Sequence, residues 1–249
     1  MSQFKNLLKA DIIKLKSTQM LWIHLYIPIL GLIAFLSYYS YAPYSSYSKV
    51  SAYLEVLCMV FPILIGIITS MVSDQEYMAG GFQNILISSE TKSLSFISKY
   101  TLFLLLGILS TILSVAGFYL GFSLMGKNNF PVNMYLAVVG ILIGGNMFEY
   151  VLHFFLSFRF SKGISIGVGI VESLISALFL TGMGDGRWPF APCAWSMRFI
   201  GSLLARYQNV NFVDPDLHLG INICIFGTVL SFLIMLIWFT KWEGKKAEE

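Results

Sequence analysis

The sequence is poor in charge. Charged side chains make up only 12% of its 249 residues and hydrophobic ones 57%, whereas a soluble chain carries about 25% charge. Too few charged groups are present to cover the surface of a soluble protein of this size. No long polar stretch marks off a hydrophilic domain. These shortages exclude a soluble enzyme and leave one membrane domain, residues 1–249.

Other features are missing as well. Two of the three cysteines, Cys58 and Cys224, lie in apolar stretches and Cys193 has no obvious partner, so we expect no structural disulfide. The N-terminus lacks a small-residue cleavage site, which argues against a cleavable signal peptide. The dinucleotide fingerprint, His-Glu-x-x-His and Gly-x-Ser-x-Gly are absent. We therefore expect neither catalytic residues nor a cofactor in this chain.

What the chain does contain is six long apolar stretches. A helix rises about 1.5 Å per residue, so about 20 residues cross the hydrocarbon layer of about 30 Å. Only three full charges fall inside them: Glu55, Glu149 and Glu172. The sequence predicts an all-α membrane protein with six transmembrane helices, at residues 21–39, 54–72, 101–124, 135–158, 163–181 and 221–240.

The basic residues predict the orientation. With an even number of crossings, both termini share a side. If that side is the cytoplasm, eleven of the 16 lysines and arginines lie inside, Lys245 and Lys246 among them. Three of the five outer ones belong to the longest loop, where the positive-inside rule is weakest. We expect both termini to be cytoplasmic.

Residues 4–16 show apolar side chains at i, i+3 and i+4 spacing, with Lys5, Lys9 and Lys16 gathered on one flank. A basic amphipathic helix of this kind lies in the headgroup plane, where its lysines meet anionic lipid. The alternative is a positive flank that only orients the first span.

The predicted inner loop, residues 73–100, begins with acids, continues with a glycine pair and then has a short apolar run. This order predicts a short helix that projects from the membrane with Phe82, Ile85 and Leu86 on one side. Exposed apolar residues of this kind need a partner surface. The alternative is a loop folded back on its own lipid interface.

Ionisable groups inside the fourth and fifth spans are the most unusual feature. A short connection makes these spans an antiparallel hairpin, which places Glu149 and Glu172 at similar depth, about 13 Å from the inner boundary. Asn146, Glu149 and His153 share one helix face. Such groups usually face the bundle interior or a wet cavity. Two interpretations stay open for these polar groups. In one they line a substrate path or couple helix movements to transport, and in the other they only form hydrogen bonds between helices. As a metal site the pair from one helix is weak, since it offers two ligands.

Glycines and prolines break the outer segment, residues 182–220. Residues 195–207 are expected to form a short helix at the outer interface. The indole rings of Trp188 and Trp195 suit the headgroup layer.

This layout resembles the membrane subunit of type-2 ABC exporters: a basic N-terminal elbow helix, six spans, and a cytoplasmic loop after the second span. The loop pattern of that family is matched by Glu76, Gly80-Gly81, Ile85-Leu86 and Ser98-Lys99. The outer stretch 184–190, continued by Ala194-Trp195-Ser196, is similar to the outer-loop motif of lantibiotic self-protection permeases.

The resemblance implies a permease subunit in the bacterial cytoplasmic membrane, with ATP and Mg held by two copies of a separate cytoplasmic ABC ATPase. It also implies a second permease chain, identical or sibling, an antimicrobial peptide as substrate, and no nucleic-acid partner. By position, the residues that would dock into the ATPase are Glu76, Gly80, Gly81, Phe82, Ile85 and Leu86.

The function expected from the resemblance is expulsion of a lantibiotic from the membrane, which protects the producer. The candidate substrate path comprises Asn146, Glu149, His153, Glu172, Arg187, Trp188, Trp195 and Arg198, with the last four expected to meet the peptide at the outer leaflet or only to anchor the segment there. The resemblance supplies no role for Glu149 and His153. One alternative is a permease of the same architecture for a lipid or drug. Another is a stand-alone immunity or protease-like membrane protein, although no adjacent glutamate pair lies inside a span.

Overall fold

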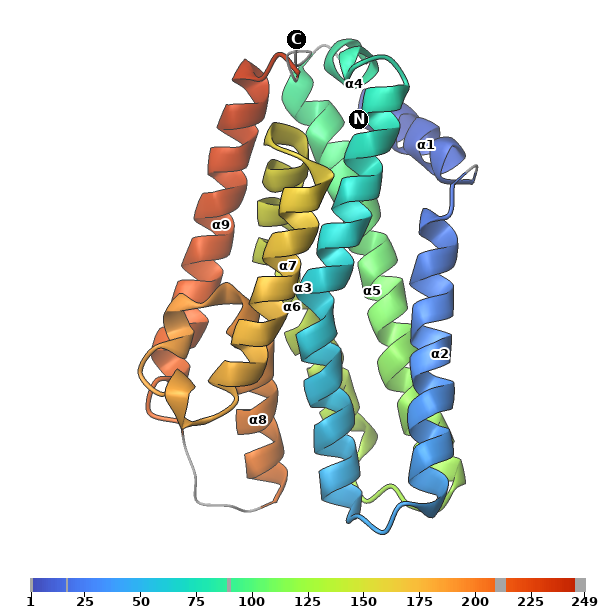
Figure 1. The fold of residues 1–249 in the computed structure, drawn as a ribbon, viewed down its shortest axis with the longest axis vertical. Coiled ribbons are helices and arrows are strands. Elements are labelled where there is room, and N and C mark those ends of the chain that lie inside the picture. Colours follow the sequence, from blue (N-terminus) through green and yellow to red (C-terminus); the bar gives the residue numbers. More distant parts are fainter. Residues whose placement is uncertain (1, 17, 89–90, 209–213, 245–249) are drawn as a thin grey trace.

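Six long helices dominate the protein (Figure 1). The structure, a computed structural model, describes residues 2–16, 18–88, 91–208 and 214–244. Within these ranges no strand occurs, and the prediction of an all-α fold with six helices able to cross a membrane is confirmed. These helices are α2 (Met20–Tyr41), α3 (Ser46–Met78), α5 (Lys92–Leu124), α6 (Val132–Arg159), α7 (Lys162–Phe179) and α9 (Leu217–Lys241).

Of the helices that extend beyond the predicted spans, α3 and α5 exceed them most. Both α3 and α5 have 33 residues, which corresponds to about 50 Å against a hydrocarbon layer of about 30 Å. Most of the described part of the predicted inner loop is therefore helical. Residues 89–90 of that loop lie outside the described ranges. Between α3 and α5 lies the short α4 (Gln83–Ile87). The turn into α4 has φ of 132° at Gly80 and 58° at Gly81, which glycine adopts without steric cost.

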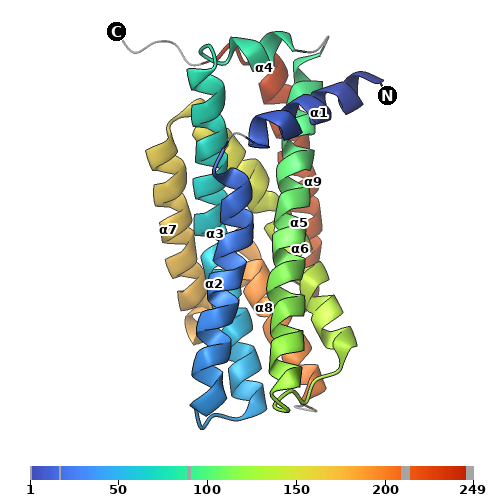
Figure 2. The ribbon, with the colours of Figure 1, turned by 90° about the vertical axis from the view of Figure 1, so that its right-hand side faces the viewer.

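A separate helix, α1 (Ser2–Lys16), covers the range expected for the amphipathic N-terminal helix. It lies across one end of the bundle, at a large angle to α2, and packs on α5 (Figure 2). This crosswise placement suits a helix in the headgroup plane, which itself stays a prediction.

Both chain ends lie at the same end of the bundle, where α1 begins and α9 ends (Figure 1). An even number of crossings requires this. That this end is cytoplasmic stays a prediction from the distribution of basic residues. Two of those residues, Lys245 and Lys246, lie outside the described ranges.

At the opposite half of the molecule, the outer segment folds into three short 3-10 turns and a helix. They are η1 (Gly182–Gly184), η2 (Trp188–Phe190), η3 (Pro192–Ala194) and α8 (Trp195–Tyr207). The bounds of α8 match the expected helix, but its direction differs from expectation. It runs along the bundle beside α6 rather than flat at the interface (Figures 1 and 2). Residues 209–213 lie outside the described ranges.

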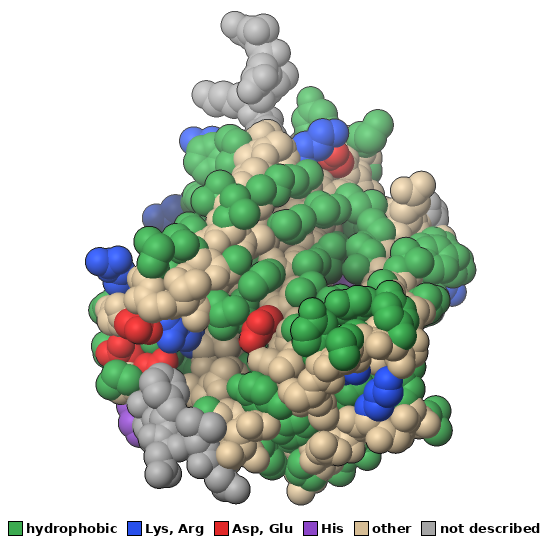
Figure 3. Space-filling view, turned by 60° about the horizontal axis from the view of Figure 1, so that its bottom comes forward, with side chains coloured by type: hydrophobic (Ala, Val, Ile, Leu, Met, Phe, Trp, Pro, Cys, Tyr) green, Lys and Arg blue, Asp and Glu red, His purple; other side chains and the backbone are tan. Residues whose placement is uncertain are grey.

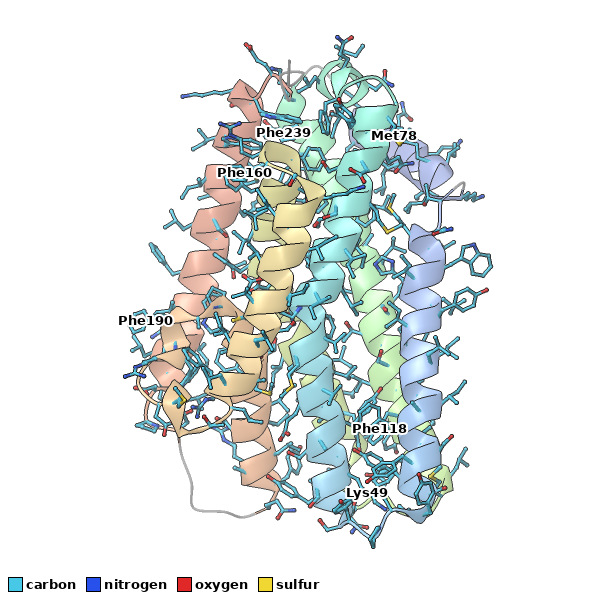
Figure 4. The ribbon with its side chains drawn as sticks, viewed as in Figure 1. Lys49, Met78, Phe118, Phe160, Phe190 and Phe239 are labelled. Atoms are coloured by element: carbon cyan, nitrogen blue, oxygen red, sulfur yellow. The ribbon has the colours of Figure 1, made fainter. Side chains whose placement is uncertain are left out.

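Aromatic side chains fill the interior. In the half away from the termini, the Tyr53 ring stacks on Phe118 with centroids 3.9 Å apart, and the Tyr53 hydroxyl donates to the Ser114 carbonyl. Near the termini, Phe239 packs against Phe96 (Phe118 and Phe239 are labelled in Figure 4). Each half of the bundle therefore has its own aromatic core.

The outer faces of the helices are apolar as well. Leu30 on α2, Leu174 on α7 and Phe226 on α9 are 63%, 67% and 69% exposed. Seen from the end opposite the termini, hydrophobic side chains cover most of the surface and charged ones form small separate groups (Figure 3). Contiguous apolar surface of this extent fits contact with lipid rather than water.

Candidate functional site

Two glycines let α7 approach α3 closely. A Cβ atom built at Gly169 would lie 2.7 Å from the Pro62 carbonyl oxygen, and one at Gly66 would lie 2.9 Å from the Ser165 carbonyl oxygen. No side chain fits at either position, so the two backbones meet directly. This contact places α7 against both α3 and α6.

Three ionisable side chains converge where α6 and α7 meet. His153 Nε2 lies 2.9 Å from Glu172 Oε2 and 3.8 Å from Glu149 Oε2. One potential ligand atom from each residue lies within 4.8 Å of the others. We call these three residues the α6–α7 cluster. The sequence-based count of two ligands was too low, because the hairpin adds Glu172 to the pair on α6.

The cluster continues into a seam of hydroxyl groups. His153 Nδ1 lies 2.9 Å from Ser165 Oγ, which in turn lies 3.4 Å from Thr69 Oγ1. Closer to the termini, Ser73 donates to the Ser157 carbonyl at 2.9 Å. Sequence reasoning missed this seam. Its only signal was the spacing of small polar residues on α3.

Glu149 is the most isolated member of the cluster. Its side chain is fully buried, no described N–H or hydroxyl group donates to its carboxyl oxygens, and its hydrogen-bond neighbour is the carboxyl group of Glu172. Glu172 is 14% exposed. The turn η3 packs against α6 and α7 nearby. Burial raises the pKa of the Cys193 thiol, and the charges of Glu149 and Glu172 raise it further.

Asn146, the fourth polar residue predicted in these spans, makes hydrogen bonds outside the cluster. Its amide donates to the Leu142 carbonyl at 2.8 Å and to Ser196 Oγ at 3.0 Å. The second bond ties α6 to α8. Asn146 therefore lies on the same helix as the α6–α7 cluster but outside it.

A second buried glutamate lies near the termini. Glu76 Oε1 is 2.8 Å from both Lys14 Nζ and Lys99 Nζ. Lys99 also contacts Asp11 Oδ1 at 2.7 Å, and Ser98 donates to the other oxygen of Asp11. This Glu76 network joins α1, α3 and α5.

The inner loop folds onto the bundle instead of projecting from it. Phe82 is fully buried and packs on Phe158 and Trp242, and Ile85 is also buried. This differs from the expected exposed apolar face, because the end of the bundle supplies the partner surface. Of the six residues predicted to contact an ATPase, Gly80 and Gly81 are exposed, Leu86 is half-buried, and Glu76, Phe82 and Ile85 are buried. Direct ATPase contact by these residues stays a prediction.

Other apolar side chains of this region do reach the surface. Met78 is 86% exposed, Ile87 77% and Tyr77 52%. Met78 projects from the end of α3 beside α4 (Figure 4). We call these three residues the α3–α4 surface. Sequence reasoning missed it because burial along so short a helix depends on how the loop folds.

The outer segment buries both of its tryptophans. Trp188 and Trp195 are almost fully covered, and Trp195 Nε1 donates to the Pro189 carbonyl at 2.9 Å. The expectation that they face the outer leaflet differs from the structure, because the segment turns back into the bundle. Phe190 between them points outward and is 68% exposed (Figure 4).

The two arginines of the segment differ in setting. Arg198 donates to the Phe179 carbonyl at 2.8 Å and pairs with Asp185 at 2.7 Å and Asp214 at 3.6 Å. It therefore holds the segment together. Arg187 is exposed. Of the four outer residues predicted to meet a substrate, only Arg187 is open to one in this conformation.

A groove of about 520 Å³ lies between α6, α8 and α9. Its lining is almost entirely apolar and includes Ile141, Leu203, Ile221 and Ile225, and Arg206 is the one charged residue among the described residues that line it. No sequence pattern marked this groove, because it arises from how α8 packs between two spans.

A family model described as ABC-2 family transporter protein matches residues 7–178. The chain belongs to this family. No curated protein and no solved structure matches the chain. As an ABC-2 permease it is a multi-pass protein of the cell membrane and a transport subunit, which does not itself catalyse, and the family implies an ATPase partner.

The match covers only part of what this ABC-2 permease contains. It includes most of α1, all of α2 to α6 and nearly all of α7, and with them the Glu76 network and the α6–α7 cluster. The outer segment from η1 onward, α8 and α9 lie beyond residue 178, and with them the α8 and α9 walls of the groove. The family therefore applies to the transport architecture, and the substrate has to be argued from the rest.

Proposed function

We propose that this ABC-2 permease removes an amphipathic antimicrobial peptide of the lantibiotic class from the membrane, as the subunit that contacts the peptide. The observation that carries the proposal is the apolar groove between α6, α8 and α9. It lies in the half away from the termini, and the one charged side chain among its described lining residues, Arg206, is exposed. A mostly apolar wall with few polar groups suits a ligand that is itself partly embedded in lipid.

In this proposal the energy comes from a separate ATPase, present in two copies, at the end that carries the termini. The α3–α4 surface is exposed there and is the natural place for it to dock. Each of α3 and α5 runs as one helix from that end into the opposite half. A tilt of these helices would move the groove, as in alternating access by rigid-body movement. A second permease chain, identical or sibling, completes the transporter.

Survival of a peptide-sensitive strain tests the proposal. The strain is challenged with a lantibiotic while it expresses the permease and its ATPase, the permease with a hydrolysis-deficient ATPase, or neither. We expect resistance only with both active partners. Resistance that persists with the inactive ATPase would contradict the proposal and favour a stand-alone immunity protein.

The groove itself can be tested with Ile225→Trp, which narrows it from the α9 side, and Leu174→Trp on the exposed face of α7 as the control. We expect the first variant to lose resistance and the second to keep it. The groove would also fit an acyl chain or a drug. If the permease transports a labelled lipid or drug and does not change the survival of the strain challenged with peptide, the substrate is that lipid or drug and not a peptide.

A further inference from the structure

We propose that Glu149, His153 and Glu172 bind one divalent transition-metal ion inside the bundle. The site would link α6 to α7 where both pack on α3. It is independent of the substrate proposed above, because it lies outside the residues that line the groove.

The spacing of the ligand atoms fits such an ion. Tetrahedral zinc has bonds of about 2.0–2.2 Å to nitrogen and oxygen, so its ligand atoms lie about 3.3 Å apart. In the cluster, His153 Nε2 is 2.9 Å from Glu172 and 3.8 Å from Glu149. These two distances bracket the required value. Catalytic zinc sites have this arrangement, in which three protein ligands leave a fourth position open.

The surroundings of Glu149 favour a bound cation. Its carboxyl group is fully buried, and its hydrogen-bond neighbour among the described residues is another carboxyl group, that of Glu172, so no described N–H or hydroxyl group donates to it. The described part of the chain places no lysine or arginine within ion-pair distance of Glu149 or Glu172. A buried carboxylate without a partner is strongly unfavourable, whereas coordination to a metal ion compensates its charge.

The surroundings of His153 also favour a bound metal ion. Ser165 Oγ lies 3.4 Å from the Gly66 carbonyl, so its proton can go there and its lone pair can accept Nδ1–H of His153. The lone pair of Nε2 then faces the two carboxyl groups. A metal-bound histidine almost always has its other ring nitrogen held in this way. Imidazole among the ligands favours zinc, copper, iron or nickel over magnesium or calcium.

Metal content of the purified full-length chain tests the proposal. The protein carries a tag without histidine, is stripped with a chelator in lipid nanodiscs, and is then titrated with Zn²⁺, Co²⁺ or Mg²⁺. We expect about one Zn²⁺ or Co²⁺ per chain, a visible Co²⁺ absorption typical of four-coordinate cobalt, and no retained Mg²⁺.

Variants locate the ion. Glu149→Gln, His153→Gln and Glu172→Gln should each weaken Zn²⁺ binding by more than about tenfold, and Ser165→Ala by about tenfold through the orientation of His153. The matched controls are Glu55→Gln, a glutamate of α3 bonded to Ser51, and His24→Gln, a buried histidine of α2. Both controls should bind as the wild type does.

Two results would overturn the proposal. One is a wild-type chain that retains no Zn²⁺ or Co²⁺ after dialysis, which would leave the cluster to be satisfied by shared protons. The other is undiminished binding in folded Glu149→Gln and Glu172→Gln. The titration of the wild-type chain tests the proposal without any substitution. The proposal can therefore be contradicted even if a variant fails to fold. Peptide resistance is measured separately, so the failure of either proposal leaves the other standing.

Discussion

Two glutamates are fully buried in the described part of this permease, and their surroundings are opposite. Glu76 contacts two lysine side chains at 2.8 Å, one from α1 and one from α5. Glu149 faces a histidine at 3.8 Å, and its hydrogen-bond neighbour among the described residues is another carboxyl group, that of Glu172. The first carboxyl group is paired with two cations through Oε1, although its Oε2 has no hydrogen-bond partner among the described residues, whereas the second has no described lysine or arginine beside it.

The difference separates a structural role from a binding role. A buried charge paired with opposite charges fixes the elements it joins, and removing one partner is costly. The Glu76 network does this for α1, α3 and α5 beside the inner loop. The α6–α7 cluster brings a histidine and two carboxyl groups together with no described lysine or arginine among them. Ionisable groups of this kind inside a membrane bundle favour a binding role over a bracing one.

The largest expected effect comes from breaking the Glu76 network. Lys99→Met removes the cation shared by Glu76 and Asp11 and should lower the free energy of unfolding by about 3 kcal/mol. The control is Lys162→Met, which breaks an exposed pair with Asp74 at 3.2 Å and should cost less than about 1 kcal/mol. Denaturant titration of the protein in detergent measures both. Equal losses would show that the network does not brace the fold.

Outside the Glu76 network, the glycine beside the α6–α7 cluster should give the largest effect. In Gly66→Ala the new methyl group would press on the Ser165 carbonyl and on the His153 ring, 3.3 Å away. We expect a loss of about 2 kcal/mol from overpacking. Gly167→Ala on α7 is the control, because its Cβ would meet nothing within 4 Å, and it should be neutral or stabilising by up to about 1 kcal/mol. A neutral Gly66→Ala would mean that the cluster lies in a looser interface.

Sequence reasoning could reach the spans because long apolar stretches specify them locally. It could also place Glu149 and Glu172 at one depth, since a short hairpin fixes their register. It could not place Phe82, Trp188 or Trp195, whose burial depends on segments that fold back over the bundle. It likewise missed Ser165 as a partner of His153, because that contact depends on which faces of α6 and α7 meet in the hairpin.

A third test compares the two glutamates directly in metal-free protein. Glu76→Gln should lose about 3 kcal/mol of stability, since it removes the carboxylate that Lys14 and Lys99 share and leaves Asp11 as the acid beside Lys99. Glu149→Gln should change stability by no more than about 1 kcal/mol, because no described lysine or arginine loses a partner and the new amide can still hydrogen-bond to Glu172. Thermal unfolding after chelation provides the comparison. A large loss in Glu149→Gln would show that this carboxyl group is already satisfied and would remove the contrast.

The smallest effect on stability is expected from substitutions on the α3–α4 surface, which lies beside the Glu76 network. Met78→Ser with Ile87→Ser removes two side chains that are 86% and 77% exposed, so the free energy of unfolding should stay within about 0.5 kcal/mol of the wild type. Co-purification with the ATPase should nevertheless fall, because these residues offer the apolar contact that Phe82 and Ile85 do not. Phe190→Ser, an exposed apolar residue in the opposite half, is the control and should leave co-purification intact. Undiminished ATPase binding by the double variant would return the contact to Gly80, Gly81 and Leu86, the predicted residues that remain accessible.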